Sequence, residues 1–307
     1  MSPLAKGGCR RDVGECRGVI FSTILLYKIL ILPNLSRFMT HFTEEIFEPK
    51  DWVKVRASTD GQQSFLTWKG SIYAILPEEG KHHLFNMVGM SVARCLLNTD
   101  GTWFLTSREL AYYLDAKTSQ RIDRWQNPWT GETVPVVHVA NHLVQRHLKY
   151  NFPGIVTADL TTFIVDLFAN YPNPLAAEYR FKEYSPQPIY QATELFKFIV
   201  PTVELKDPNL TSVKQMTLTW DRMGPWLPWM KMGNHLGSLV YSAWGSKVAD
   251  IKDLPLLLKT EINGNLSLYQ TAPLSQIEAM DMTSWIYFKT HFDAYLTGKV
   301  FPLSQIQ

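Results

Sequence analysis

The fold class of this chain is decided by one stretch, which reads Ser64-Phe-Leu-Thr-Trp-Lys-Gly-Ser-Ile-Tyr-Ala-Ile-Leu76, then Pro77-Glu-Glu-Gly80, then His83-Leu-Phe-Asn-Met-Val-Gly-Met-Ser-Val-Ala-Arg94. Apolar and polar residues alternate on both sides of a turn that contains proline and glycine. A period of two puts successive side chains on opposite faces of a strand. We therefore expect two antiparallel strands joined by a short turn.

The same alternation continues through most of the chain. Turn residues at 98–101 and 115–119 separate further strands, which are predicted at 103–114, 134–140, 155–168, 176–184, 193–205, 213–222 and 239–242. Helices are predicted only at 253–258 and 284–295. The second of these places Trp285, Phe288 and Phe292 on one face.

Residues 39–307 show no fixed repeat and no low-complexity linker, so we expect a single antiparallel β domain. A mainly β chain with few helices hides its strand edges as an antiparallel barrel or a two-sheet sandwich, or by forming a homodimer. Barrels of about eight strands or more enclose small ligands, and the comparison with calycins is an analogy of fold alone. The C-terminal helix is expected to pack on the sheet.

The composition supplies ample material for a core, since the 307 residues are 46% hydrophobic and 13% aromatic. The net charge of +2 is unevenly distributed. Residues 1–38 carry six basic and two acidic side chains, which leaves the rest of the chain with an excess of two acids. Nucleic-acid-binding domains show a basic patch or stripe, so we expect no nucleic-acid partner.

Residues 1–38 have two interpretations. Their basic start and the apolar run at 18–32 resemble a secretory signal, although no small-x-small cleavage site follows. Lys28 interrupts the run, which is shorter than the ~20 apolar residues of a transmembrane helix. A leader or membrane anchor predicts a membrane-associated or exported protein. In the second interpretation, residues 1–38 are upstream sequence and translation starts at Met39, which predicts a cytoplasmic protein.

Signatures of metal and cofactor binding are weak. Two of the three cysteines lie in residues 1–38, and no third ligand of matched spacing accompanies His138 and His142, which are separated by four positions. The phosphate-binding glycine motifs and the Gly-x-Ser-x-Gly nucleophile motif are missing from the sequence. We expect no metal site and no cofactor.

Residues 219–233 are unusually rich in tryptophan, methionine, proline and glycine. Pro225 and Pro228 fix φ and remove two backbone donors, which predicts a stiff segment. The large side chains of this segment then form either the wall of an apolar pocket or part of the core. As the pocket wall we select Trp226, Trp229 and Met230.

Polar candidates come from the carboxylates Glu109, Glu132 and Glu194. Glu194 lies in the largely apolar run 191–199, where a buried acid needs a partner, and Arg222 is the predicted one. Such a pair is either structural or catalytic. His138 interrupts an apolar strand, so Glu194 and His138 are the candidate catalytic residues. The candidate ligand-binding residues are Trp226, Trp229 and Met230 of the pocket wall, together with Trp129, Asn141, Tyr190 and Arg222.

Several longer motifs point to one family. They are Tyr112-Tyr-Leu-Asp-Ala-Lys-Thr118, Trp125-Gln-Asn-Pro-Trp-Thr-Gly-Glu-Thr-Val-Pro-Val-Val-His-Val-Ala-Asn141, Tyr190-Gln-Ala-Thr-Glu-Leu-Phe-Lys-Phe-Ile-Val-Pro201, Gly224-Pro-Trp-Leu-Pro-Trp-Met-Lys-Met-Gly233 and Thr283-Ser-Trp-Ile-Tyr-Phe-Lys289. With them the chain resembles, over residues 50–295, the microbial family catalogued as domain of unknown function 1838. The resemblance implies kinship and supplies no catalytic residues.

Three functions are consistent with these patterns. The first is binding of an apolar small molecule, such as a terpenoid, a lipid or an aromatic metabolite, in an aromatic-lined cavity. The second is a cofactor-independent hydratase or isomerase in which Glu194 or His138 transfers a proton to or from such a ligand. The third is a non-catalytic interaction module, with possible membrane association through residues 18–32.

Overall fold

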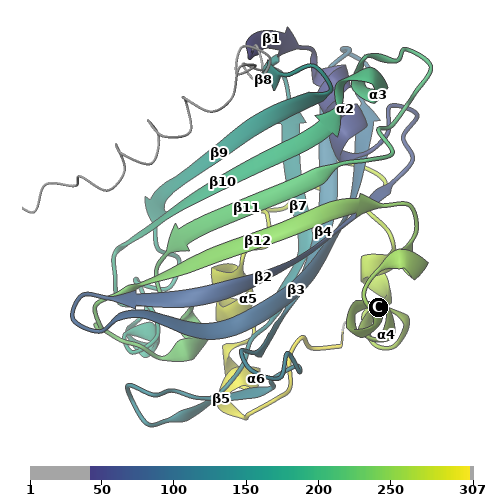
Figure 1. Cartoon of the computed structure of the whole chain (residues 1–307). Helices are drawn as coiled ribbons and strands as arrows, with labels where there is room; N and C mark the ends of the chain where they lie inside the picture. Colours follow the sequence, from purple (N-terminus) through teal and green to yellow (C-terminus); the bar gives the residue numbers. More distant parts are fainter. Residues whose placement is uncertain (1–41, 305–307) are drawn as a thin grey trace, which may run out of the picture. The chain divides into compact units, whose positions relative to one another are not determined.

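The computed structural model of the chain describes residues 42–304, in which ten antiparallel strands form one sheet that curls into a half-barrel (Figure 1). This confirms the expected mainly β, antiparallel fold. The interpretations of residues 1–38 lie outside the described residues. In spatial order, the strands are β1 (Thr43–Phe47), β8 (Phe152–Val156), β9 (Leu160–Pro172), β10 (Ile189–Pro201), β11 (Thr217–Gly224), β12 (Ser238–Val248), β2 (Ser64–Leu76), β3 (Gly80–Leu97), β4 (Trp103–Asp115) and β7 (Val139–Leu148).

The sheet consists of two runs of sequential hairpins joined along one seam. Strands β2, β3, β4 and β7 form the first run, and β8 to β12 form the second. The seam is the pairing of β12 with β2, where Tyr241 lies opposite Ile72 and Ala243 opposite Gly70. A Cβ atom on Gly70 would lie 2.4 Å from the carbonyl oxygen of Ser242, so the two strands approach closely there.

The stretch that indicated the fold class forms β2 and β3 as predicted, with Gly80 at a positive φ of 76° in the turn. Three other predicted strands differ in the structure. The strand predicted at 155–168 is a hairpin of β8 and β9, which turns where Thr157 and Leu160 exchange backbone and side-chain hydrogen bonds. Residues 176–184 form turns around the short helix η2 (Tyr179–Phe181).

The strand predicted at 134–140 is broken into two. Its first part is β6 (Thr133–Pro135), which pairs with β5 (Arg124–Gln126) in a separate two-stranded sheet, and its second part begins β7. The break lies at His138, whose Nδ1 accepts a hydrogen bond from the backbone N–H of Tyr113 at 3.1 Å. The imidazole thus takes the place of the backbone acceptor that would have continued the pairing with β4.

Two aromatic clusters bury the inner face of the sheet at its opposite ends. The first cluster contains Trp226, Trp229 and Met230 together with the helices α5 (Ser284–Thr290) and α6 (Phe292–Leu296). The second contains Phe163 and Phe198 and lies under α2 (Pro49–Arg56) and α3 (Thr202–Lys206). On the outer face, α4 (Leu256–Asn263) approaches β4, where Tyr112 donates a hydrogen bond to Glu261. Short 3-10 helices occur at η3 (Pro228–Met230), η4 (Ile251–Asp253) and η5 (Ser267–Gln270).

The C-terminal helix confirms the prediction at 284–295. Thr283 caps it by accepting a hydrogen bond from the N–H of Ile286, and Trp285, Phe288 and Phe292 are all buried against the first cluster. His291 separates the segment into α5 and α6. Within residues 42–304, no helix combines the length and apolar character needed to cross a membrane.

Replacement of Trp229 tests whether the first cluster stabilises the fold. The side chain is 2% exposed and packs within 6 Å of the rings of Phe85, Tyr113 and Trp125. Trp229→Ala should lower the free energy of unfolding by about 3–5 kcal/mol, because it leaves a cavity. Trp244 on the outer face is 60% exposed, so Trp244→Ala should change the free energy of unfolding by less than about 0.5 kcal/mol. Urea unfolding followed by circular dichroism measures both; equal losses would contradict the assignment of Trp229 to the core.

Candidate functional site

Glu194 and Arg222 lie opposite each other on neighbouring strands, as the sequence predicted. They are cross-strand partners in the register of β10 and β11, and Arg222 Nε lies 3.6 Å from Glu194 Oε1. The indole of Trp220 donates a hydrogen bond of 3.0 Å to Glu194 Oε2, and Arg222 Nη2 donates one of 2.9 Å to the hydroxyl of Tyr190. Three of the predicted site residues, Glu194, Arg222 and Tyr190, therefore form one constellation.

Arg222 is held in its charged form by its surroundings. Only 7% of the residue is exposed, and burial by itself would lower the pKa of the guanidinium. Tyr241, Tyr190 and Glu194 outweigh this effect and raise the pKa above its ordinary value. The ring of Tyr241 lies 4.8 Å from the guanidinium carbon, in a cation–π arrangement. A buried cation of this kind needs the opposite charge of Glu194 beside it.

A second carboxyl, Glu109 on β4, faces this constellation across the curl of the sheet. Burial raises the pKa of Glu109, a hydrogen bond from Asn141 and the charge of Arg56 lower it, and the charge of Glu194 raises it further. Four strands separate β4 from β10 in the sheet. Glu109 and Glu194 can therefore influence each other only across the concave side, which is the inner face.

Asn141 belongs to the Glu109 side of the curl. It lies opposite Glu109 in the register of β7 and β4, and its Nδ2 donates a hydrogen bond of 3.1 Å to Glu109 Oε2. Asn141 is one of the predicted ligand-binding residues, whereas Glu109 is a predicted carboxylate candidate without an assigned role. A sequence pattern could have identified Glu109, because alternation along β4 puts it on the same face as Ala111 and Tyr113.

Two tryptophans lie on the inner face between these carboxyls. Trp68 on β2 rests over Gly89, where an added Cβ atom would come within 2.4 Å of the indole ring. Trp220 on β11 packs almost parallel to Phe196, with an interplanar angle of 15°. Both tryptophans are partly buried and contact both aromatic clusters, so they mark the stretch of inner face that separates the clusters.

We call this stretch the central band. Its members share the inner face and are neither fully buried nor fully exposed: Trp68, Glu109, Val139, Asn141, Val165, Glu194, Phe196 and Trp220. Within residues 42–304, several buried polar atoms beside or in the band have no hydrogen-bond partner, namely Trp68 Nε1, Ser91 Oγ, Asn141 Oδ1 and Arg222 Nη1. Unpaired buried polar groups are rare in folded proteins and mark positions where a bound molecule or water supplies the partner.

The residues predicted as pocket walls lie elsewhere, in the first aromatic cluster. Trp226, Trp229 and Met230 are 7%, 2% and 0% exposed. Trp226 donates a hydrogen bond to the carbonyl of His235, and the carbonyl of Met230 accepts one from Asn127. Trp129 is half-buried at the edge of the cluster and donates to Glu79. These contacts pack the side chains into the first cluster, where the buried indole Nε1 of Trp229 has no hydrogen-bond partner in residues 42–304. Their role as pocket walls stays a prediction.

His138 does not join Glu194. It is 1% exposed and lies between the rings of Tyr112 and Tyr113, with Nε2 3.9 Å from Asp123 Oδ1. Burial lowers its pKa, while Asp123 opposes that effect. The charged groups that act on it, which are Arg121, Asp123 and Glu261, are outside the central band. In the described residues, no cluster of three His, Cys, Asp or Glu side chains has the geometry of a metal site.

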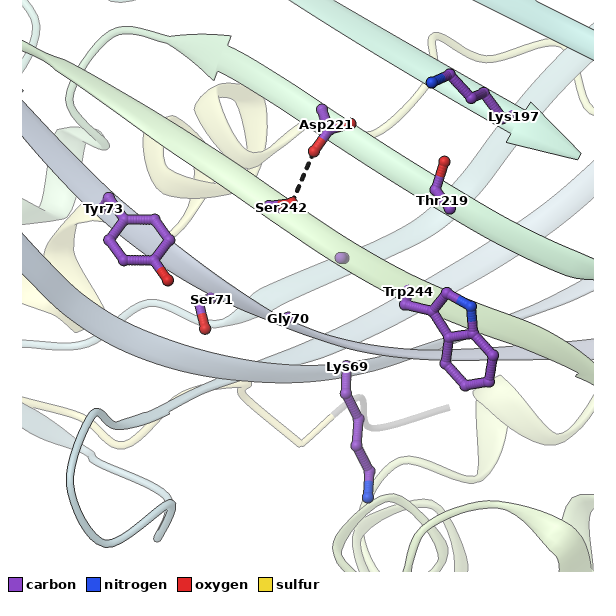
Figure 2. A pocket seen from close by; sticks show the side chains of 10 residues that line it. Lys69, Gly70, Ser71, Tyr73, Lys197, Thr219, Asp221, Ser242 and Trp244 are labelled. Carbon is purple, nitrogen blue, oxygen red and sulfur yellow. Dashed lines mark hydrogen bonds between the residues drawn. The ribbon is translucent and has the colours of Figure 1, made fainter. Parts of the chain in front are cut away.

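The outer face of the sheet carries a separate hollow of about 590 Å³ (Figure 2). Lys69, Trp244 and Thr219 lie in one cross-strand row there, and Asp221 accepts a hydrogen bond of 2.7 Å from Ser242. The charged side chains of this hollow are exposed to solvent. Glu109 and Arg222, whose pKa values are raised, lie on the inner face instead, so we take the central band as the candidate functional site.

The burial of Glu109 predicts a pH-dependent stability. Because its pKa is raised in the folded state, its contribution to stability is complete below the unfolded-state pKa and is lost as the pH rises through the folded-state pKa. Glu109→Gln keeps the hydrogen bond from Asn141 and removes the ionisation. The variant should melt above the wild type at pH 8, and the two should converge near pH 4. Glu278→Gln, which is exposed, is the control; a difference independent of pH would contradict the prediction.

Comparisons with known proteins give a family but no activity. Among the curated proteins, none matches the chain significantly. The sequence model of the family described as "Protein of unknown function (DUF1838)" matches residues 61–292, which include β2 to β12 and every residue of the central band. The chain therefore belongs to the DUF1838 family.

Proposed function

We propose that the protein binds a small, largely apolar molecule on the inner face of its sheet, with the body of the ligand against the rings of the central band and its polar group at the carboxyls. One observation carries the proposal: half-buried aromatic and aliphatic side chains of the central band surround the carboxyls of Glu109 and Glu194, and burial raises the pKa of Glu109. Small-molecule sites combine an apolar lining with a few placed polar groups in this way.

The rigidity of the polar groups supports the same proposal. Glu194 is fixed by Trp220 and Arg222, and Arg222 is fixed in turn by Tyr190 and the ring of Tyr241. Glu109 is fixed by Asn141. Side chains that are already oriented lose little conformational entropy when a ligand binds.

Retention of a compound by the purified full chain tests the proposal. We expect native mass spectrometry to detect a bound species, which solvent extraction releases as an apolar compound. Trp68→Ala should weaken rebinding of the extracted compound at least tenfold, because the indole forms part of the band. Trp244→Ala, which changes the outer hollow of Figure 2, should leave rebinding unchanged. If Trp244→Ala loses binding and Trp68→Ala does not, the compound binds on the outer face and the proposal is wrong.

Proton transfer on the bound molecule is a second candidate function. The raised pKa of Glu109 supports it, because a carboxyl with a raised pKa is better suited to donate a proton, and the carboxyl of Glu194 lies on the same inner face. Incubation of the extracted compound with the protein in D₂O should then introduce deuterium at carbon. Glu109→Gln should abolish this exchange while the variant still binds the compound. Equal exchange in both proteins would exclude Glu109 from the reaction.

A further inference from the structure

We propose that the outer hollow of Figure 2 is a second binding site, which takes an acidic carbohydrate, meaning a sugar ring that carries a carboxylate. Its volume of about 590 Å³ lies within the range of small-molecule sites. The hollow is on the opposite face of the sheet from the central band. The inference therefore goes beyond the proposed function and does not depend on it.

The hollow has a low floor between two aromatic side chains. The floor consists of small residues from β2 and β12, which are Gly70, Ser71, Ser242 and Ala243. Figure 2 shows Tyr73 on one side of this floor and Trp244 on the other. The register agrees, because Trp244 lies opposite Lys69 and Tyr73 lies opposite Val240, which puts the two rings about 13 Å apart along the strands. The floor is therefore broad enough for a ring to lie flat on it.

Trp244 offers a flat apolar surface to such a ring. It belongs to β12, which has neighbouring strands on both sides, and it is 60% exposed. One face of a pyranose ring consists mainly of C–H groups that pack on an aromatic ring, whereas the hydroxyls lie around its edge. Exposed apolar surface with a polar rim is typical of ligand-binding grooves. The indole is thus placed to stack with a sugar.

The polar lining of the hollow complements the hydroxyls of a sugar. Ser71, Thr219 and Ser242 carry hydroxyl groups, which donate and accept hydrogen bonds. Ser242 donates a hydrogen bond of 2.7 Å to Oδ1 of Asp221, and this bond orients the carboxylate. Oδ2 of Asp221 accepts no hydrogen bond from residues 42–304, so it is available to a donor on the ligand. A purely apolar ligand would leave these groups unpaired.

Two lysines give the hollow its preference for a carboxylate. Lys197 on β10 and Lys69 on β2 lie at the two ends of the cross-strand row that contains Thr219 and Trp244. Both lysines are exposed, and within residues 42–304 neither has an ion pair. Among the described residues that line the hollow, Asp221 is the one acid, so the lining has an excess positive charge. A ring stacked on Trp244 would have an ammonium group on either side to pair with its carboxylate.

Other acidic chains fit the hollow less well. Peptides often bind by pairing with the edge of a sheet, but here the backbones of β11, β12 and β2 are already paired with their neighbours. A single-stranded nucleic acid stacks on aromatic rings as well, yet its phosphates would approach the carboxylate of Asp221. A sugar meets that carboxylate with hydroxyl groups. Carbohydrate is therefore the class that matches the ring, the hydroxyls and the lysines together.

Calorimetric titration of the full chain at pH 7.5 tests the inference with acidic and neutral hexasaccharides. The acidic ones are hexamers of galacturonate, mannuronate and hyaluronan, and the neutral ones are cellohexaose and maltohexaose. At least one acidic sugar should bind at least tenfold more tightly than both neutral sugars. Added salt should reduce this preference, because it screens exposed charges. Equal affinities for acidic and neutral sugars would overturn the inference, and so would the absence of acidic-sugar binding at millimolar concentrations.

Two acidic chains of other classes, hexaglutamate and hexauridylate, are titrated in the same way. Each should bind at least tenfold more weakly than the best acidic sugar. Equally tight binding of hexaglutamate would assign the hollow to an acidic peptide, and equally tight binding of hexauridylate would assign it to single-stranded nucleic acid. Either result would overturn the inference.

Variants of the hollow locate the sugar. Trp244→Ala should weaken binding of the acidic sugar at least tenfold, while circular dichroism should show an unchanged fold because the side chain is exposed. Lys69→Gln and Lys197→Gln should each weaken it about fivefold, as expected for exposed ion pairs, and should leave neutral sugars unaffected. Lys214→Gln, an exposed lysine outside the hollow, is the matched control and should change nothing. Unchanged binding in Trp244→Ala would overturn the inference.

Discussion

The sheet must bury one of its faces, and it does so at both ends but not in the middle. Aromatic side chains fill the inner face under α5 and α6 and again under α2. Between these ends the sheet carries small residues, such as Gly89 and Gly245, beside the large ring of Trp68. The apolar clusters supply the stability of the fold, which permits the central band to hold polar and charged groups that a continuous core would exclude.

Charge balance explains why those groups are tolerated. A buried arginine alone would be strongly destabilising, and Arg222 is compensated by Glu194, Tyr190 and the face of Tyr241. Glu109 has the weaker compensation, from Asn141 and Arg56, and keeps a raised pKa. Such an imbalance lowers the stability of the fold when Glu109 ionises, and sites that bind or react with other molecules often contain groups of this kind.

The sequence predicts the local features well and the long-range ones poorly. Alternation identified β2, β3 and β4, and the apolar context of Glu194 identified its pairing with Arg222. Both signals depend on residues close in sequence or on neighbouring strands. The approach of Glu109 to Glu194 depends on the curl of the sheet, which no local pattern encodes. The same limit applies to Trp226 and Trp229, because a row of large rings looks alike whether it lines a pocket or fills a core. His138 broke its predicted strand through a side-chain hydrogen bond that periodicity does not detect.

The seam between β12 and β2 has a consequence for the order in which the molecule forms. Each run of hairpins joins strands that follow one another in sequence, so each can form from contacts of short range, whereas the seam joins residues near 70 to residues near 243. Glu109 belongs to the first run and Glu194 to the second. The two carboxyls therefore share one inner face only in a sheet whose seam has closed, and a ligand bound to both runs would stabilise the closed sheet over any form in which the seam is open.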